Sequence, residues 1–233
     1  YNIKNCRNDG KITAENWAGG IVGKTYSTVE GNCFSECVNN GQVIADAPNG
    51  GIIGAYYGSS LRLPESKRGT LYIKKCKNTG DISCESFDVM GTGGILGFLS
   101  INAETEGVQI TDCINTGNVS MQKNGRLGGI LGKVDYAQKS SENWSIENCV
   151  NTGTIQYQNG TEPFKEDLKE RVFEDCRTPD EKAVVIMGGS CMGGIIGEMY
   201  GGSVKNCMSS GEVHVNDDYK GFAGAICGQV FFT

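Results

Sequence analysis

Hydrophobic residues along this chain come in short runs, separated by polar residues and glycine, and the same order of runs returns many times. In the stretch from Ile110 to Val119, an isoleucine stands three positions before a cysteine, and a glycine and a valine follow that cysteine. No copy of this pattern contains the roughly 10 to 12 residues of 3.6-residue periodicity that a helix would need. Short apolar segments bounded by turn residues predict β-strands.

This order defines a repeat with six copies. The copies of its first motif read IKNCRNDGKIT from Ile3, FSECVNNGQVI from Phe34, IKKCKNTGDIS from Ile73, ITDCINTGNVS from Ile110, IENCVNTGTIQ from Ile146 and VKNCMSSGEVH from Val204. A second motif follows each copy, and its copies read GGIVG from Gly19, GGIIG from Gly50, GGILG from Gly93, GGILG from Gly128, GGIIG from Gly193 and GAICG from Gly224. Paired motifs that recur in one order indicate a repeat protein.

The apolar positions predict three short strands in each repeat. One strand ends at the cysteine, one follows the glycine of the first motif, and one crosses the Gly-Gly motif. Such a small unit cannot bury its own apolar face, so the units must stack. We therefore expect an all-β fold, a parallel, right-handed β-solenoid of about six repeats that forms a single domain over residues 1–233. A six-bladed propeller is the alternative, although each blade would need four strands.

Two columns of equivalent residues are expected to run along the stack. The cysteines are Cys6, Cys37, Cys76, Cys113, Cys149 and Cys207, and the asparagines are Asn8, Asn39, Asn78, Asn115 and Asn151. We expect the cysteines to be reduced and buried as small hydrophobic residues. We expect the asparagines to take left-handed backbone corners and to hydrogen-bond along the column, with Gly117 and its equivalents adopting positive φ beside them.

The Gly-Gly motif has two apolar residues at its centre, although neighbouring strand residues face opposite sides of a sheet. One of the two rows is then expected to face outward as an apolar stripe, covered by a loop, another domain or another chain. The residues of this stripe are Ile53, Leu96, Leu131 and Ile196.

The third residue after each Gly-Gly motif is often aromatic. This row contains Tyr26, Tyr57, Tyr200 and Phe231, with Tyr136 one position later in its repeat. In a stack of coils these rings would form a row along one edge, and exposed rings bind sugars through apolar contacts. We take the four tyrosines as candidate ligand-binding residues, and packing of the rings over a corner is the alternative.

Residues 157–191 form an insertion that breaks the repeat. In its sequence TEPFKEDLKERVFEDC, Thr161 is a candidate N-cap, and Phe164, Leu168 and Val172 have helical spacing, so we expect a short amphipathic helix. The helix either packs on the flank of the solenoid or contributes to a binding face. Cys176 and Cys191 bracket the end of the insertion and are candidates for a disulfide.

Composition and charge narrow the classes of function. Glycine accounts for 35 of the 233 residues, about twice its average share. The 21 basic and 27 acidic residues give a net charge of -6 without a long run of one sign, so we expect no nucleic-acid partner. No stretch of about 18 consecutive apolar residues predicts a membrane span in this segment.

Catalytic and metal-binding patterns are missing from the sequence. His214 is the only histidine, so a Ser/His/Asp or Cys/His arrangement would have to include it. Neither an HExxH motif nor a paired CxxC motif is present. We therefore expect no catalytic residue, no metal site and no cofactor.

The second motif carries a family resemblance. Its Gly-Ile-hydrophobic-Gly tetrads start at Gly20, Gly51, Gly94, Gly129 and Gly194. They resemble the GLUG motif of bacterial surface proteins, in which U is a hydrophobic residue. The tetrads have Ile in place of Leu, and the last copy begins at Ala225 instead of glycine. The resemblance implies an extracellular or cell-surface location in a bacterium, in accessory regions of larger proteins that include some immunoglobulin-cleaving metalloproteases, and it implies no catalytic residue in the repeats.

Together these observations favour a non-catalytic cell-surface module that acts as a spacer or adhesion domain. Its expected partners are glycans or host surface proteins, together with flanking domains of the same chain, since the sequence starts inside a repeat as a segment of a longer protein would. The first alternative is a carbohydrate-active enzyme of the β-helix type, such as a polysaccharide lyase or hydrolase. The second is a stalk that binds no ligand.

Overall fold

The structure is a computed structural model that describes most of the repeats. The described residues are 1–26, 32–46, 48–58, 69–85, 88–101, 107–122, 125–135, 143–157, 170–172, 184–186, 190–215 and 221–231. Every regular element in these ranges is a β-strand.

The repeats form six coils, and each coil contains five strands of the solenoid. Coil 1 contains β1 (Asn2–Lys4), β2 (Arg7–Asn8), β3 (Ile12–Ala14), β4 (Ala18–Gly19) and β5 (Val22–Tyr26). Coil 2 contains β6 (Cys33–Ser35), β7 (Val38–Asn39), β8 (Val43–Ala45), β9 (Asn49–Gly50) and β10 (Ile53–Tyr57). Coil 3 contains β11 (Thr70–Lys74), β12 (Lys77–Asn78), β13 (Ile82–Cys84), β14 (Asp88–Gly93) and β15 (Leu96–Ser100).

The remaining coils follow the same order. Coil 4 contains β16 (Gly107–Thr111), β17 (Ile114–Asn115), β18 (Val119–Met121), β19 (Gly125–Gly128) and β20 (Leu131–Val134). Coil 5 contains β21 (Trp144–Glu147), β22 (Val150–Asn151), β23 (Ile155–Tyr157), β26 (Ser190–Gly193) and β27 (Ile196–Tyr200). Coil 6 contains β28 (Ser203–Lys205), β29 (Met208–Ser209), β30 (Val213–His214), β31 (Gly221–Gly224) and β32 (Cys227–Phe231).

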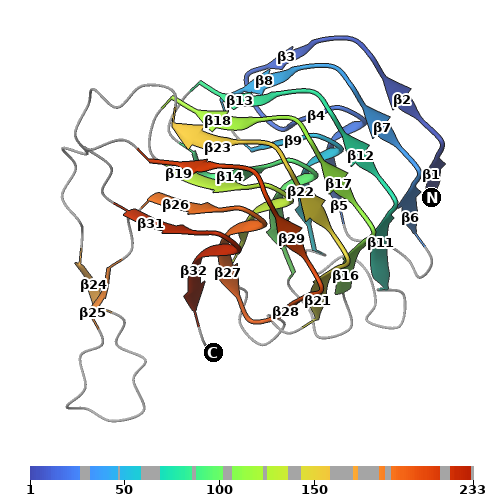
Figure 1. The fold of residues 1–233 in the computed structure, drawn as a ribbon. Coiled ribbons are helices and arrows are strands. Elements are labelled where there is room, and N and C mark those ends of the chain that lie inside the picture. Colours follow the sequence, from blue (N-terminus) through green and yellow to red (C-terminus); the bar gives the residue numbers. More distant parts are fainter. Residues whose placement is uncertain are drawn as a thin grey trace.

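Equivalent strands of successive coils pair in parallel and form five six-stranded sheets. We number these sheets by their strand in coil 1, so that the fifth sheet has the order β5-β10-β15-β20-β27-β32. Figure 1 shows the coils stacked one behind another, with the N-terminus in the first coil and the C-terminus in the last. The expected all-β fold with stacked parallel strands is confirmed. The expected three strands per repeat are wrong, because the residues after the cysteine form a separate strand and a turn divides the Gly-Gly motif.

The left-handed corners lie elsewhere than expected. Positive φ occurs at the residue directly before each motif cysteine, and these residues are Asn5, Glu36, Lys75, Asp112, Asn148 and Asn206. The column asparagines and Gly117 are not among the positive-φ residues, so that prediction is wrong. Gly117 is required for a different reason, because a Cβ there would lie 2.0 Å from the carbonyl oxygen of Gly80 in the neighbouring coil. The glycines of the first motif therefore allow the coils to approach closely.

The interior of the solenoid is filled by apolar residues of the first, third, fourth and fifth sheets and of the corners, whereas the second sheet buries its column asparagines. Both central residues of the Gly-Gly motif face it, since Ile52 and Ile53 are fully buried in the main core, as are Ile95 and Leu96. The outward apolar stripe expected at Ile53 and its equivalents is therefore wrong. Ile52 belongs to the turn between β9 and β10, and at such a corner the strict alternation of faces along a strand no longer holds.

Of the insertion, the structure describes two short strands. β24 (Glu170–Val172) and β25 (Val184–Ile186) pair in antiparallel fashion and are labelled in Figure 1. The expected helix is wrong at its end, because Val172 lies in a strand, and its earlier part, with Thr161, Phe164 and Leu168, lies outside the described residues. The run of β-branched residues in β25 favours an extended partner for β24 over a helix.

Candidate functional site

The column asparagines form one continuous chain of hydrogen bonds. Each Nδ2 donates to Oδ1 of the asparagine in the next coil, with distances of 2.7 Å from Asn8 to Asn39, 2.7 Å from Asn39 to Asn78, 2.7 Å from Asn78 to Asn115 and 2.8 Å from Asn115 to Asn151. The same Nδ2 groups also donate to the glycine carbonyl two residues later, as from Asn115 to Gly117 at 2.8 Å. Buried amides that saturate one another hold the coils together and leave little capacity for a ligand.

The second glycine of the Gly-Gly motif makes room for this column. A Cβ at Gly94 would lie 2.4 Å from Cγ of Asn115, and a Cβ at Gly129 would lie 2.4 Å from Cγ of Asn151. The asparagine of the first motif and the second glycine of the second motif thus pack against each other. In the last coil Ser209 takes the place of the asparagine, and it accepts a hydrogen bond from Asn151 at 3.4 Å. The hydrogen-bonded column ends there.

The motif cysteines donate hydrogen bonds to backbone carbonyls at the coil corners. Sγ of Cys113 donates to the carbonyl of Thr111 at 3.3 Å, and Sγ of Cys149 donates to that of Glu147 at 3.3 Å. Burial raises the pKa of the Cys37 thiol to about 11 and that of Cys113 well above its usual range. Neutral buried thiols are poor nucleophiles. Cys37 and Cys113 are therefore structural, whereas Cys6 in the first coil is exposed and Cys207 in the last is half-buried. Hydrogen bonding to Cys113 lowers the pKa of the other two buried thiols of the column, Cys76 and Cys149.

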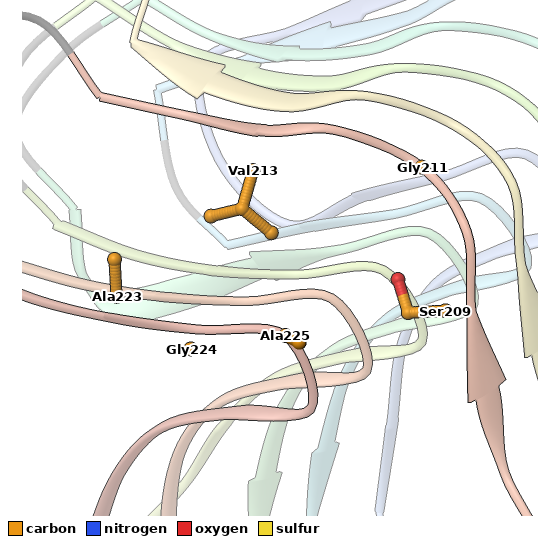
Figure 2. Close-up of a pocket in the computed structure, with 6 residues that line it drawn as sticks. All are labelled: Ser209, Gly211, Val213, Ala223, Gly224 and Ala225. Carbon is orange, nitrogen blue, oxygen red and sulfur yellow. The ribbon is translucent and has the colours of Figure 1, made fainter.

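A hollow of about 290 Å³ opens at the last coil, between the stretches Ser209–Val213 and Ala223–Ala225. Figure 2 shows that Val213, Ala223 and the Ser209 hydroxyl line it from these two sides. Among the described residues that line it there is no titratable side chain, so these residues offer no acid, base or charged group for chemistry on a ligand.

The candidate tyrosines do not form one continuous row. Tyr26 pairs in register with Tyr57, and Tyr57 pairs with Ser100, where the row of rings is interrupted. Tyr200 pairs with Phe231 at the other end of the fifth sheet. Tyr136 lies outside the described residues. The exposures also differ, because 61% of the Tyr26 surface is accessible and only 8% of that of Tyr200.

Near the first coil, three rings surround one ammonium group. Nζ of Lys24 lies 4.1 Å from the ring centroid of Trp17, 4.4 Å from that of Tyr57 and 4.9 Å from that of Tyr26. Nε1 of Trp17 donates to Oη of Tyr57 at 3.4 Å, and the rings of Tyr57 and Phe98 are 5.3 Å apart. We call Trp17, Lys24, Tyr26 and Tyr57 the Lys24 cluster. It combines accessible aromatic surface with a positive charge.

The sequence patterns alone did not single out Trp17 or Lys24. A signal was present for Lys24, because it stands two residues before Tyr26 and so shares its face of a strand. Trp17 precedes the Gly-Gly motif only in coil 1, and a residue that breaks a repeat at one position is a reason to look for function there.

Near the last coils, the same face of the fifth sheet carries a buried ion cluster. Nε of Arg126 lies 2.9 Å from Oε2 of Glu198, and Nζ of Lys133 lies 3.6 Å from Oε1 of the same carboxylate. Sγ of Cys191 lies 3.1 Å from Oε1 of Gln229. We call Arg126, Lys133 and Glu198 the Glu198 cluster. Burial raises the pKa of the Cys191 thiol, so this thiol stays protonated, and the cluster has the character of a structural ion network.

Cys176 lies outside the described residues, so the suggested disulfide with Cys191 stays a prediction. His214 is exposed, and its Nδ1 lies 3.3 Å from Oε1 of Glu212. Within the described ranges, no group of three His, Cys, Asp or Glu side chains is placed to hold a metal ion. In the same ranges, no helix is long and apolar enough to cross a membrane.

Comparison with known protein families gives a match in the segment that joins the fifth and sixth coils. The GLUG motif matches residues 188–215. The matched GLUG segment spans β26 to β30 and contains the GGIIG sequence from Gly193 and the VKNCMSSGEVH sequence from Val204. The resemblance to GLUG-motif repeats, a family of bacterial proteins, is thereby confirmed. No curated protein and no solved structure matches the chain.

Proposed function

We propose that this chain is a non-catalytic repeat module of a bacterial cell-surface protein, which spaces other domains and binds glycans through the Lys24 cluster. The observation that carries the proposal is the gathering of three aromatic rings within 4.9 Å of one ammonium group on an accessible face. Aromatic faces bind sugar rings through apolar contacts, and the phenol and indole groups add hydrogen bonds.

The spacer role is supported by the column architecture. Each coil is tied to its neighbours by strand pairing and by the asparagine column, and each added coil lengthens the stack by about 4.8 Å. A stack of this kind holds its two ends at a set separation, as a spacer between domains must.

A glycan array tests the binding role. We expect wild-type protein to bind a subset of glycans, and folded Tyr26→Ala and Trp17→Ala variants to lose the signal. The matched control is Tyr72→Ala, because Tyr72 on β11 also packs against a lysine, with Nζ of Lys74 4.1 Å from its ring, but has no second ring at that lysine in the described residues. Binding that survives in Tyr26→Ala and is lost in Tyr72→Ala would contradict the proposed site. Silence of the wild-type protein across the array would favour the stalk.

A further inference from the structure

The Lys24 cluster holds a charge that the described ion pairs do not neutralise. The basic residues of those pairs are Arg7, Arg126, Lys133, Lys205 and His214, so Lys24 has no carboxylate within 4 Å in the described part of the chain. Lys24 is half-buried, and its ammonium lies against aromatic rings instead. Cation–π contacts orient such a group but leave its positive charge in place.

The backbone beside this lysine is also unusual. Trp17 has a φ of 50°, in the left-handed region that bulky residues seldom adopt. Such a conformation persists only where the surroundings stabilise it, and it directs the chain so that the Trp17 ring covers Lys24. Three rings and a fixed ammonium are therefore presented together, with 39% of the surface of Trp17 and 61% of that of Tyr26 accessible.

Building on the proposed function, we propose that the Lys24 cluster binds acidic glycans, in which a carboxylate-bearing sugar such as a uronic or sialic acid places its carboxylate on the Lys24 ammonium. A neutral sugar would use the rings alone. A carboxylate adds a charge-assisted hydrogen bond to the ammonium, and such bonds are about twice as strong as neutral ones. A cationic ligand is disfavoured, because the Lys24 ammonium lies beside all three rings and would repel it.

The experiment is titration calorimetry with two matched pairs of sugars. One pair is tetragalacturonic acid and its carboxyl-reduced form, and the other is sialyllactose and lactose. We expect wild-type protein to bind at least one acidic sugar about tenfold or more tighter than its neutral partner, the gain typical of one charged hydrogen bond. This preference should weaken as NaCl is raised from about 0.05 to 0.5 M.

Three variants assign the preference to Lys24. Lys24→Met keeps an apolar stem but removes the charge, and it should bring the affinities for an acidic sugar and its neutral partner to within about twofold of each other. Lys24→Arg keeps the charge and should retain the preference. Lys74→Met is the matched control, since it removes the same charge from a lysine that covers the ring of Tyr72, and it should behave as wild type.

The outcomes separate this inference from the proposed function. Equal or tighter binding of the neutral sugars by wild-type protein would overturn the acidic preference and leave glycan binding standing. A preference that persists in folded Lys24→Met would overturn the role of Lys24. No binding of these four sugars or of any other glycan on the array would overturn both the inference and the glycan-binding role.

Discussion

In the first and fifth coils, the same repeat positions of the fifth sheet have two different environments. One and three residues after the motif glycine, β5 has Lys24 and Tyr26, and β27 has Glu198 and Tyr200. The first pair lies on an accessible face, with 61% of the surface of Tyr26 exposed, whereas Glu198 is 2% and Tyr200 8% exposed. The pairing also differs, because β5 is the edge strand of the sheet and pairs only with β10 among the described strands, whereas β27 lies between β20 and β32.

The difference comes from the neighbouring strands. Beside Lys24 the chain supplies the ring of Trp17, and beside Glu198 it supplies the guanidinium of Arg126 from β19. A repeat thus sets the backbone position of a side chain, and the residues around it decide whether that side chain contacts solvent or a buried partner. Equivalent positions in a solenoid need not share a function.

The largest expected effect is the loss of the buried carboxylate. Glu198→Gln leaves Arg126, whose side chain is 11% exposed, without its anionic partner. We expect a loss of about 3–5 kcal/mol in the free energy of unfolding, measured by urea denaturation. Lys24→Met at the equivalent position should lose less than about 1 kcal/mol. Equal losses would show that the two environments do not differ as described.

The next effect separates the two tyrosines. Tyr200 packs against Phe231, with ring centroids 4.4 Å apart, and is nearly buried, so Tyr200→Ala should cost about 3 kcal/mol. Tyr26→Ala removes a mostly exposed ring and should cost less than about 1 kcal/mol while abolishing glycan binding. Thermal unfolding followed by circular dichroism measures the stabilities. A larger loss in Tyr26→Ala would mean that its ring is a packing element.

A change in the asparagine column should lower the stability of the protein and leave glycan binding by the Lys24 cluster unchanged. Asn115→Ala leaves an Nδ2 donor of Asn78 and the carbonyl of Gly117 without their partner, at a cost of about 1–3 kcal/mol. Glycan affinity should stay within about twofold of wild type, because the column is buried. A folded Asn115→Ala variant with strongly reduced affinity would contradict a purely architectural role for the column.

The smallest effect concerns the thiols of the first and inner coils. Cys6 is exposed and should react rapidly with a thiol reagent at pH 8, whereas Cys113 is buried with a raised pKa and should react slowly. The pKa of Cys37 is raised from 9.0 to about 11, so its contribution to stability is present below pH 9 and is lost as the pH rises toward 11. Labelling monitored by mass spectrometry, and urea midpoints at pH 8 and about 10.5, check both statements. Rapid labelling of Cys113 in folded protein would contradict its burial.

Much of the fold could be predicted from the sequence, because six aligned copies show the same preferences for strands and turns at the same positions. The spacing of the motif cysteines was enough to predict stacked parallel strands, and aligning Asn78 with Asn115 was enough to predict a column of hydrogen bonds. The strand count per coil was not predictable in this way, since two-residue strands such as β17 have no periodicity to read.

The repeat, the parallel stacking and the columns of equivalent residues could be predicted from the amino-acid sequence, because they depend on residues that align with their own copies. The face on which each aromatic ring lies, the positions of the left-handed corners and the charges that come into contact depend on how the coils pack. Arg126 and Glu198 are 72 residues apart, and Trp17 and Tyr57 are 40 apart. Contacts of this kind join unlike positions of different coils, so they arise from the register of the stack and the curvature of each coil, which no single copy of the motif encodes.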